Sequence, residues 1–251
     1  MVHIIGAGCG AVDLITVRGK KYLEEADVII YAGSLVNKEL LQYAKEGCAL
    51  YDSAEMTLEE VLAVIEGAEA EHKMTVRLHS GDPALYGAIG EQMREFDARG
   101  IAYDITPGVS AFSGAAAALK TEYTLPDVSQ TVIITRASGK TVVPESENLR
   151  SLASHGATMV LFLSTGLLNR VSEELIAGGF SPDAPAAIVY KASWDDEKIC
   201  RCTVSTLEET AKANHITKTA LITVGGFLDS EFSRSKLYDP TFTTEFREAS
   251  K

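Results

Sequence analysis

A short polar turn after residue 79 is the first place where the residue types could do chemistry. It reads Ser80-Gly81-Asp82-Pro83. Apolar and polar residues alternate over 74–79, which predicts a strand, and 84–91 is expected to enter a helix. Such a turn leaves main-chain polar groups and one carboxylate at the carboxyl end of the strand, where open α/β sheets bind ligands. An ordinary strand–turn–helix connection explains the same residues, so both interpretations stay open on this stretch alone.

A glycine-rich turn at 6–11 is the second candidate. Glycines at 6 and 8 and alanine at 11 match a loose dinucleotide-binding fingerprint, so a nicotinamide- or flavin-dependent oxidoreductase is one candidate function. However, Asp27 stands at the start of the next strand, whereas ribose recognition needs an acidic residue at its end. The following helix is expected to begin near Thr16, too late to meet a pyrophosphate. A tight turn with positive φ explains the glycines equally well.

The elements that position these turns follow from the order of periodic segments. We expect strands at 2–5, 27–31, 48–51, 74–79 and 102–105, alternating with helices at 16–26, 37–44, from 57, 84–99 and 109–119. This alternation predicts an α/β domain over 1–120 with a mostly parallel sheet.

The second half of the chain has a different pattern. Residues 121–130 lack a clear period and are expected to be a linker. A second α/β domain is expected over 131–251, with a polar tail from residue 230. Its strands are expected at 131–136, 158–163, 186–190, 198–204 and 219–224, with helices at 147–153, 167–177 and 205–214. The short link at 191–197 predicts an antiparallel pair, so this sheet is expected to be mixed.

Composition limits the classes of function. The 251 residues carry a net charge of −12, which makes general binding to nucleic acid or anionic membranes a poor candidate. The apolar runs are too short to cross a bilayer, and a strand at the very start predicts no leader segment. The four cysteines show neither a CxxC pair nor zinc-ligand spacing, so we expect free thiols, a cytoplasmic protein and no metal site.

Several ordered runs resemble one known family, the tetrapyrrole methylases, which use S-adenosylmethionine. The three signature turns are 6–10 with 13–19, 80–83 with 86–87, and 106–110. Further runs at 31–36, 79–92, 125–136 and 189–194 resemble the branch of the family that methylates precorrin-4 at C11. The resemblance extends from about Val2 to Phe227. Two positions depart from the family pattern: Cys9 stands where proline is usual, and Glu55 where glycine is more usual.

The resemblance implies a fold, an activity and partners. It implies a cofactor cleft between two domains, and methyl transfer from S-adenosylmethionine to C11 of precorrin-4, with closer similarity to the cobalt-precorrin-4 enzymes. The products are S-adenosylhomocysteine and (cobalt-)precorrin-5, in cobalamin biosynthesis. It also implies a homodimer. Methylation of another precorrin position and a non-enzymatic cofactor or tetrapyrrole carrier stay open as alternatives. Because the donor is already activated, we name no catalytic base.

The resemblance also assigns residues. The expected cofactor-binding residues are Cys9, Ser80, Gly81, Asp82, Leu85, Tyr86, Ser110, Ala111, Thr165 and Ala192. A turn cap is the alternative role for Asp82, and a helix cap for Ser110. Arg18 and Arg136 are expected to bind the carboxylate arms of the anionic substrate, although a surface role explains either one. His79 is expected to be a buried histidine with its hydrogen bonds satisfied.

Overall fold

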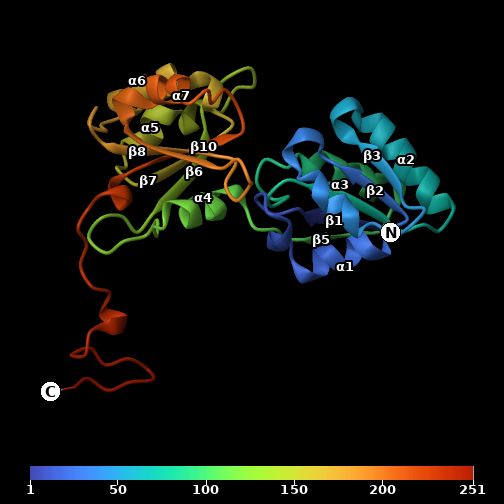
Figure 1. Ribbon diagram of the computed structural model, residues 1–251, viewed down its shortest axis with the longest axis horizontal. Coiled ribbons are helices and arrows are strands. Elements are labelled where there is room, and N and C mark those ends of the chain that lie inside the picture. The colour runs from blue at the N-terminus through green and yellow to red at the C-terminus, as the bar shows by residue number, and fades with distance from the viewer. Residues whose placement is uncertain (251) are drawn as a thin grey trace. The chain divides into compact units, whose positions relative to one another are not determined.

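The structure is a computed structural model that describes residues 1–250 (Figure 1). Contacts divide the chain into two units, which are described separately. The first comprises Met1–Ala115 and Lys191–Glu197, and the second Ala116–Tyr190 and Lys198–Lys251. The contact boundary therefore lies at 115/116, and residues 191–197 belong to the first unit although they connect two strands of the second. The role of 121–130 as a linker stays a prediction.

The first unit contains a five-stranded sheet in which all strands are parallel, where the alternating pattern predicted a mostly parallel sheet. Its strands are β1 (Val2–Gly6), β2 (Val28–Tyr31), β3 (Ala49–Asp52), β4 (Thr75–His79) and β5 (Tyr103–Thr106). Their order is β3-β2-β4-β1-β5. Because β1 lies between β4 and β5, the turns that follow these three strands share one edge of the sheet.

Helices cover both faces of this sheet. They are α1 (Val17–Glu25), α2 (Leu58–Ala70) and α3 (Ile89–Arg99), while α4 (Ala111–Leu119) crosses the boundary between the units. Alternate strand residues pack on opposite sides: Ile4 and Ile30 share a core cluster with α2 and α3, whereas Ile5 and Ile29 share one with Leu23 of α1. Because alternate residues of each strand pack on opposite faces, the unit has three layers, with the sheet between two layers of helices.

Capping residues explain where α1 and α2 begin, and two of the predicted helices differ in the structure. Thr16 caps α1, and Thr57 with Glu60 forms the predicted capping box of α2. The helix predicted at 37–44 is a 3₁₀ helix over Lys38–Tyr43. The helix expected from residue 84 begins only at Ile89, because Tyr86 and Ala88 have φ values of 56° and 50°, outside the right-handed helical region.

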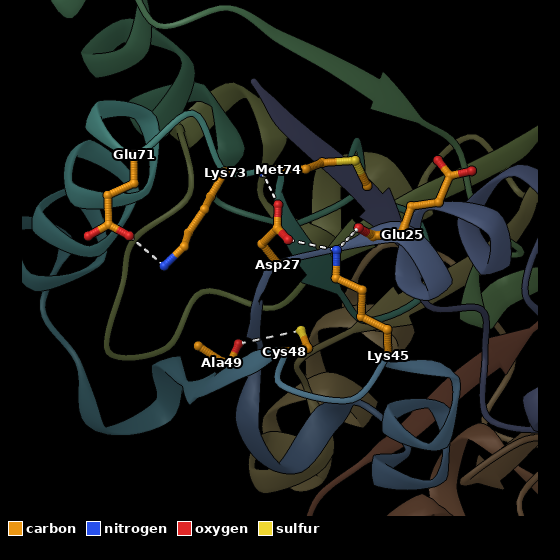
Figure 2. Close-up of polar contacts among 8 residues, drawn as sticks. All are labelled: Glu25, Asp27, Lys45, Cys48, Ala49, Glu71, Lys73 and Met74. Carbon is orange, nitrogen blue, oxygen red and sulfur yellow. Dashed lines mark hydrogen bonds and ion pairs between the residues drawn. The ribbon is translucent and has the colours of Figure 1, made fainter.

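Asp27 fixes the amino-terminal edge of this sheet (Figure 2). Its Oδ2 accepts a hydrogen bond from the Met74 N–H at 2.8 Å, and its Oδ1 pairs with Lys45 Nζ at 2.6 Å. Lys45 Nζ also donates to the Glu25 carbonyl. The hydrogen bonds from Lys45 and then Met74 hold the pKa of Asp27 below its ordinary value. Asp27 therefore joins the starts of β2 and β4, which agrees with the sequence argument against ribose binding.

The second unit contains a mixed five-stranded sheet, as predicted. Its strands are β6 (Val132–Arg136), β7 (Thr158–Phe162), β8 (Pro185–Tyr190), β9 (Lys198–Thr203) and β10 (Ala220–Val224), in the order β6-β7-β10-β8-β9. Strands β6 and β7 are parallel, and the other neighbours are antiparallel. Helices α5 (Leu149–Ala153), α6 (Leu168–Ala177) and α7 (Leu207–Ala213) pack with the sheet around Leu161 and Ile222. Among residues 1–250, no helix has the length and apolarity needed to cross a membrane.

Candidate functional site

The turns that follow β1, β4 and β5 meet backbone against backbone. A Cβ atom at Gly6 would lie 2.5 Å from the Gly81 carbonyl oxygen and 2.6 Å from Gly108 Cα. One at Gly108 would lie 2.1 Å from the same Gly81 oxygen. Gly8, at φ 82°, exchanges two main-chain hydrogen bonds with Gly81. Close approach of the main chains therefore explains these glycines without any bound dinucleotide.

Asp82 joins two of these turns. Its Oδ1 accepts from the Ala84 N–H at 2.8 Å, and its Oδ2 accepts from the Gly108 N–H at 2.9 Å. Asp82 therefore caps its turn, which was the alternative to ligand binding for this residue. Each carboxylate oxygen has a further lone pair, so capping leaves Asp82 able to accept a hydrogen bond from a cationic ligand.

Ser110 and Ala111 lie directly against this edge. A Cβ atom at Gly81 would be 3.5 Å from the Ala111 nitrogen and 3.7 Å from Ser110 Cα. The hydroxyl groups of Ser80 and Ser110 make no hydrogen bond to any residue in the range 1–250, although Ser110 is only 6% exposed. The predicted helix-capping bond of Ser110 is thus not found there. Two hydroxyl groups without protein partners fit a polar ligand at this edge.

The loop between β4 and α3 carries the next predicted residues. Leu85 is held by a hydrogen bond from its N–H to the Asp82 carbonyl, and the Tyr86 side chain is 44% exposed. A positive φ at a residue as bulky as Tyr86 is strained, and strain of this kind is typical of binding loops.

Cys9 and Ala192 come together although they lie far apart in the sequence. A Cβ atom at Gly114 would be 2.7 Å from Cys9 Sγ and 3.3 Å from Ala192 Cβ. Their neighbours Ser193 and Trp194 also contact the glycine turn: Ser193 Oγ lies 3.3 Å from Cys9 Sγ, and Trp194 Nε1 donates to the Cys9 carbonyl. The sequence reasoning did not assign these two contacts. The sequence signal that could have indicated them is Trp194, a tryptophan in the short link at 191–197.

Two buried polar residues on β4 lie behind the loop. Arg77 is 6% exposed and donates to Gln92 Oε1 and to the Ile30 carbonyl, and burial lowers its pKa to about 10. Burial, with the charge of Arg77, lowers the pKa of His79 to about 3, so the imidazole is neutral at pH 7. His79 is buried as expected, but the expectation that its bonds are satisfied is wrong, since its Nε2 has no partner within residues 1–250.

Two of the remaining predicted residues belong to the second unit. Thr165 belongs to the second unit, where its hydroxyl donates to the Ala220 carbonyl at 3.1 Å. Arg136, also in the second unit, donates to the carbonyls of Thr141 and Val142 at 2.9 Å each. Arg18 is exposed on α1. Within residues 1–250, no group of three or more His, Cys, Asp or Glu side chains has the arrangement of a metal site.

The sequence of the chain is similar to those of one known protein family. The family model described as "Tetrapyrrole (Corrin/Porphyrin) Methylases" matches residues 1–208. The cobalt-precorrin-4 C(11)-methyltransferase of Methanocaldococcus jannaschii is 53% identical over 251 residues, which cover 100% of this chain and 97% of that protein. These matches span the signature turns of the first unit and most of the second.

Two solved structures are similar in fold as well as in sequence. The X-ray structure of a cobalt precorrin-4 methyltransferase matches with a TM-score of 0.89 and 48% identity, covering 91% of this chain and 96% of that chain. A uroporphyrin-III C-methyltransferase from Thermus thermophilus, complexed with S-adenyl homocysteine, matches with a TM-score of 0.76 and 25% identity, covering 90% and 98%. The chain therefore belongs to the tetrapyrrole methylase family.

Proposed function

We propose that this chain transfers a methyl group from S-adenosylmethionine to C11 of precorrin-4, preferentially in its cobalt form, and so takes part in cobalamin biosynthesis. The observation that carries the proposal is the 53% identity to a cobalt-precorrin-4 C(11)-methyltransferase over the full chain. The meeting of two separate turns at one sheet edge supports it, because Gly81 and Asp82 come from one turn and Ser110 and Ala111 from the other.

The edge of the first sheet supplies groups that fit the methyl donor. Ser80 and Ser110 offer hydroxyl groups, and Asp82 offers a carboxylate for an ammonium group. Cys9, Leu85, Tyr86 and Ala192 belong to the same unit and are proposed to contact the donor as well. Thr165, in the second unit, is the remaining residue of the proposed set. The sulfonium, when bound, supplies an already activated methyl group. The chain's own residues then bind and orient it, which can lower the barrier by up to about 7–11 kcal/mol in ideal cases.

The substrate's carboxylate arms need cations on a chain with a net charge of −12. We propose Arg18 and Arg136 for this role. Arg136 already uses one N–H on each of Nη1 and Nη2, and a guanidinium carries five N–H donors in all, so three remain for a carboxylate.

A labelled methyl donor tests the proposal. The purified chain is incubated with metal-free and with cobalt-loaded precorrin-4 and with S-adenosylmethionine carrying a ¹³C methyl group. The proposal predicts that one labelled methyl is found at C11 by NMR, faster with the cobalt form. Label at another carbon would favour a methyltransferase for a different position. Binding of both ligands without transfer would favour a carrier. Equal rates with the two forms would remove only the cobalt preference.

Cellular location and assembly belong to the same proposal. We infer a cytoplasmic protein, supported by the free thiols of Cys9, Cys48, Cys200 and Cys202, which suit a reducing compartment. A homodimer is proposed because the family resemblance implies one. Sedimentation equilibrium tests it: a mass twice the 26.9 kDa of the chain is expected, and a monomer across the micromolar range would contradict it.

A further inference from the structure

The loop Lys191–Glu197, here called the clamp loop, is held in an uncommon conformation. Lys191 and Ser193 have φ values of 46° and 67°. Two hydrogen bonds fix this shape: the Ser193 N–H donates to Glu197 Oε2 at 2.6 Å, and the Trp194 N–H donates to the Lys191 carbonyl at 3.0 Å. Left-handed backbone at residues other than glycine has a cost and persists only where the surroundings enforce it. The contacts of the loop with the rest of the first unit must therefore stabilise this conformation.

The clamp loop forms hydrogen bonds with two main-chain groups of the glycine turn. Ser193 Oγ accepts from the Ala11 N–H at 3.0 Å, and Trp194 Nε1 donates to the Cys9 carbonyl at 3.2 Å. The carbonyl between them, that of Gly10, accepts from Asn37 Nδ2 at 3.1 Å. Side chains from remote segments therefore satisfy each of these groups, and the turn depends on them for its shape.

The indole ring also sets the position of Gly10. A Cβ atom at Gly10 would lie 2.2 Å from Trp194 Cδ1 and 2.7 Å from the Ala192 carbonyl oxygen. The ring is fixed in turn by Lys191, whose Nζ lies 5.2 Å from the ring centroid and pairs with Asp196. Cysteine at position 9 does not restrict φ as the proline usual in the family would. The contacts with Trp194 and Ser193 therefore restrict the backbone of the turn instead.

We propose that Ser193 and Trp194 are positioning residues that hold the main chain of Cys9–Ala11 in the shape that binds the methyl donor. This inference rests on the proposed function, in which Cys9 and Ala192 contact the donor. It assigns a role to the two residues that follow Ala192 and that were not among the predicted site residues.

The test compares four variants with the wild-type chain by calorimetric titration with S-adenosylhomocysteine. Ser193→Ala and Trp194→Phe each remove one hydrogen bond, and Phe keeps a ring against Gly10. Ser193→Gly removes the hydroxyl but suits the positive φ, which separates the hydrogen bond from backbone strain. Asp195→Asn is the matched control, because Asp195 is exposed in the same loop and makes no hydrogen bond within residues 1–250.

Loss of one such hydrogen bond is expected to raise the Kd for S-adenosylhomocysteine by about fivefold in the first three variants. KM for the methyl donor should rise with it while kcat stays near the wild-type value, a split that a general loss of folding would not produce. Asp195→Asn should bind as the wild type does. Unchanged Kd values for Ser193→Gly and Trp194→Phe would overturn the positioning role alone. A wild-type chain that binds no S-adenosylhomocysteine would overturn the proposed function and this inference with it.

Discussion

The Asp82 carboxylate accepts a hydrogen bond from the Gly108 N–H over 2.9 Å, which ties the turn after β4 to the turn after β5. The same carboxylate caps its own turn at Ala84. One side chain therefore holds together two of the segments proposed to bind the methyl donor, and its structural role and its binding role reinforce each other.

Replacing this carboxylate tests the link. Asp82→Asn retains one acceptor oxygen but places an NH₂ group opposite either the Gly108 or the Ala84 N–H. A donor without an acceptor should destabilise the chain by about 1–3 kcal/mol and also weaken binding of S-adenosylhomocysteine. Urea unfolding and calorimetry measure the two effects. Asp183→Asn, at an exposed position in the second unit, is the control. An Asp82→Asn chain with wild-type stability would show that the link to Gly108 has no energetic role.

The packing of the glycine turns gives a second prediction. Gly108→Ala places a methyl group 2.1 Å from the Gly81 carbonyl, so the turns must separate, at a cost of about 1–3 kcal/mol or more. Gly67→Ala is the matched control, since a Cβ atom there meets nothing within 4 Å and lies inside α2. This control should stabilise the chain by up to about 1 kcal/mol. Thermal unfolding compares them, and equal effects of the two substitutions would contradict the packing argument.

The sequence predicted the elements better than it predicted the contacts between them. The periodicity of apolar residues predicted all ten strands, and the Thr57–Glu60 pair predicted the start of α2. Both signals depend only on residues close together in the sequence. The start of α3 was missed, because Tyr86 and Ala88 adopt positive φ values that their residue types do not favour. The contact of Trp194 with Gly10 and the bond from Gly108 to Asp82 join remote segments. Nothing in the spacing of residues specifies such pairs.

The buried side chain of Gln92 donates a hydrogen bond to the Ala88 carbonyl, in the loop between β4 and α3. Its Oε1 accepts from Arg77 Nε at 3.1 Å, so Gln92→Met, which roughly keeps the volume, would leave a buried charged donor without that partner. The expected loss is about 1–3 kcal/mol in unfolding free energy. Gln42→Met, at an exposed position, should change stability by less than about 0.5 kcal/mol. Urea midpoints measure both, and a Gln92→Met chain as stable as the wild type would refute the supporting role.

His79 predicts a dependence of stability on pH. Its pKa is lowered to about 3 in the folded chain, against an ordinary value of 6.5. Between these values the unfolded chain binds the extra proton, so stability is full above about pH 6.5 and falls as the pH drops below it. One proton corresponds to about 1.4 kcal/mol per pH unit, so lowering the pH from 6.5 to 5 should remove roughly 1–2 kcal/mol.

A comparison of variants isolates this effect. His79→Gln should flatten the pH dependence of the urea midpoint between pH 5 and 6.5, whereas His155→Gln, at an exposed position, should leave it as it is in the wild type. If both variants keep the wild-type slope, His79 is not the group that titrates.

The central claim is that the edge formed by the ends of β1, β4 and β5 binds the methyl donor. A crystal structure of the chain with S-adenosylhomocysteine tests it most directly. Electron density for the ligand is expected within hydrogen-bonding distance of Ser80, Asp82 or Ser110. Density at any other place, with the hydroxyl groups of Ser80 and Ser110 bonded to protein instead, would contradict it.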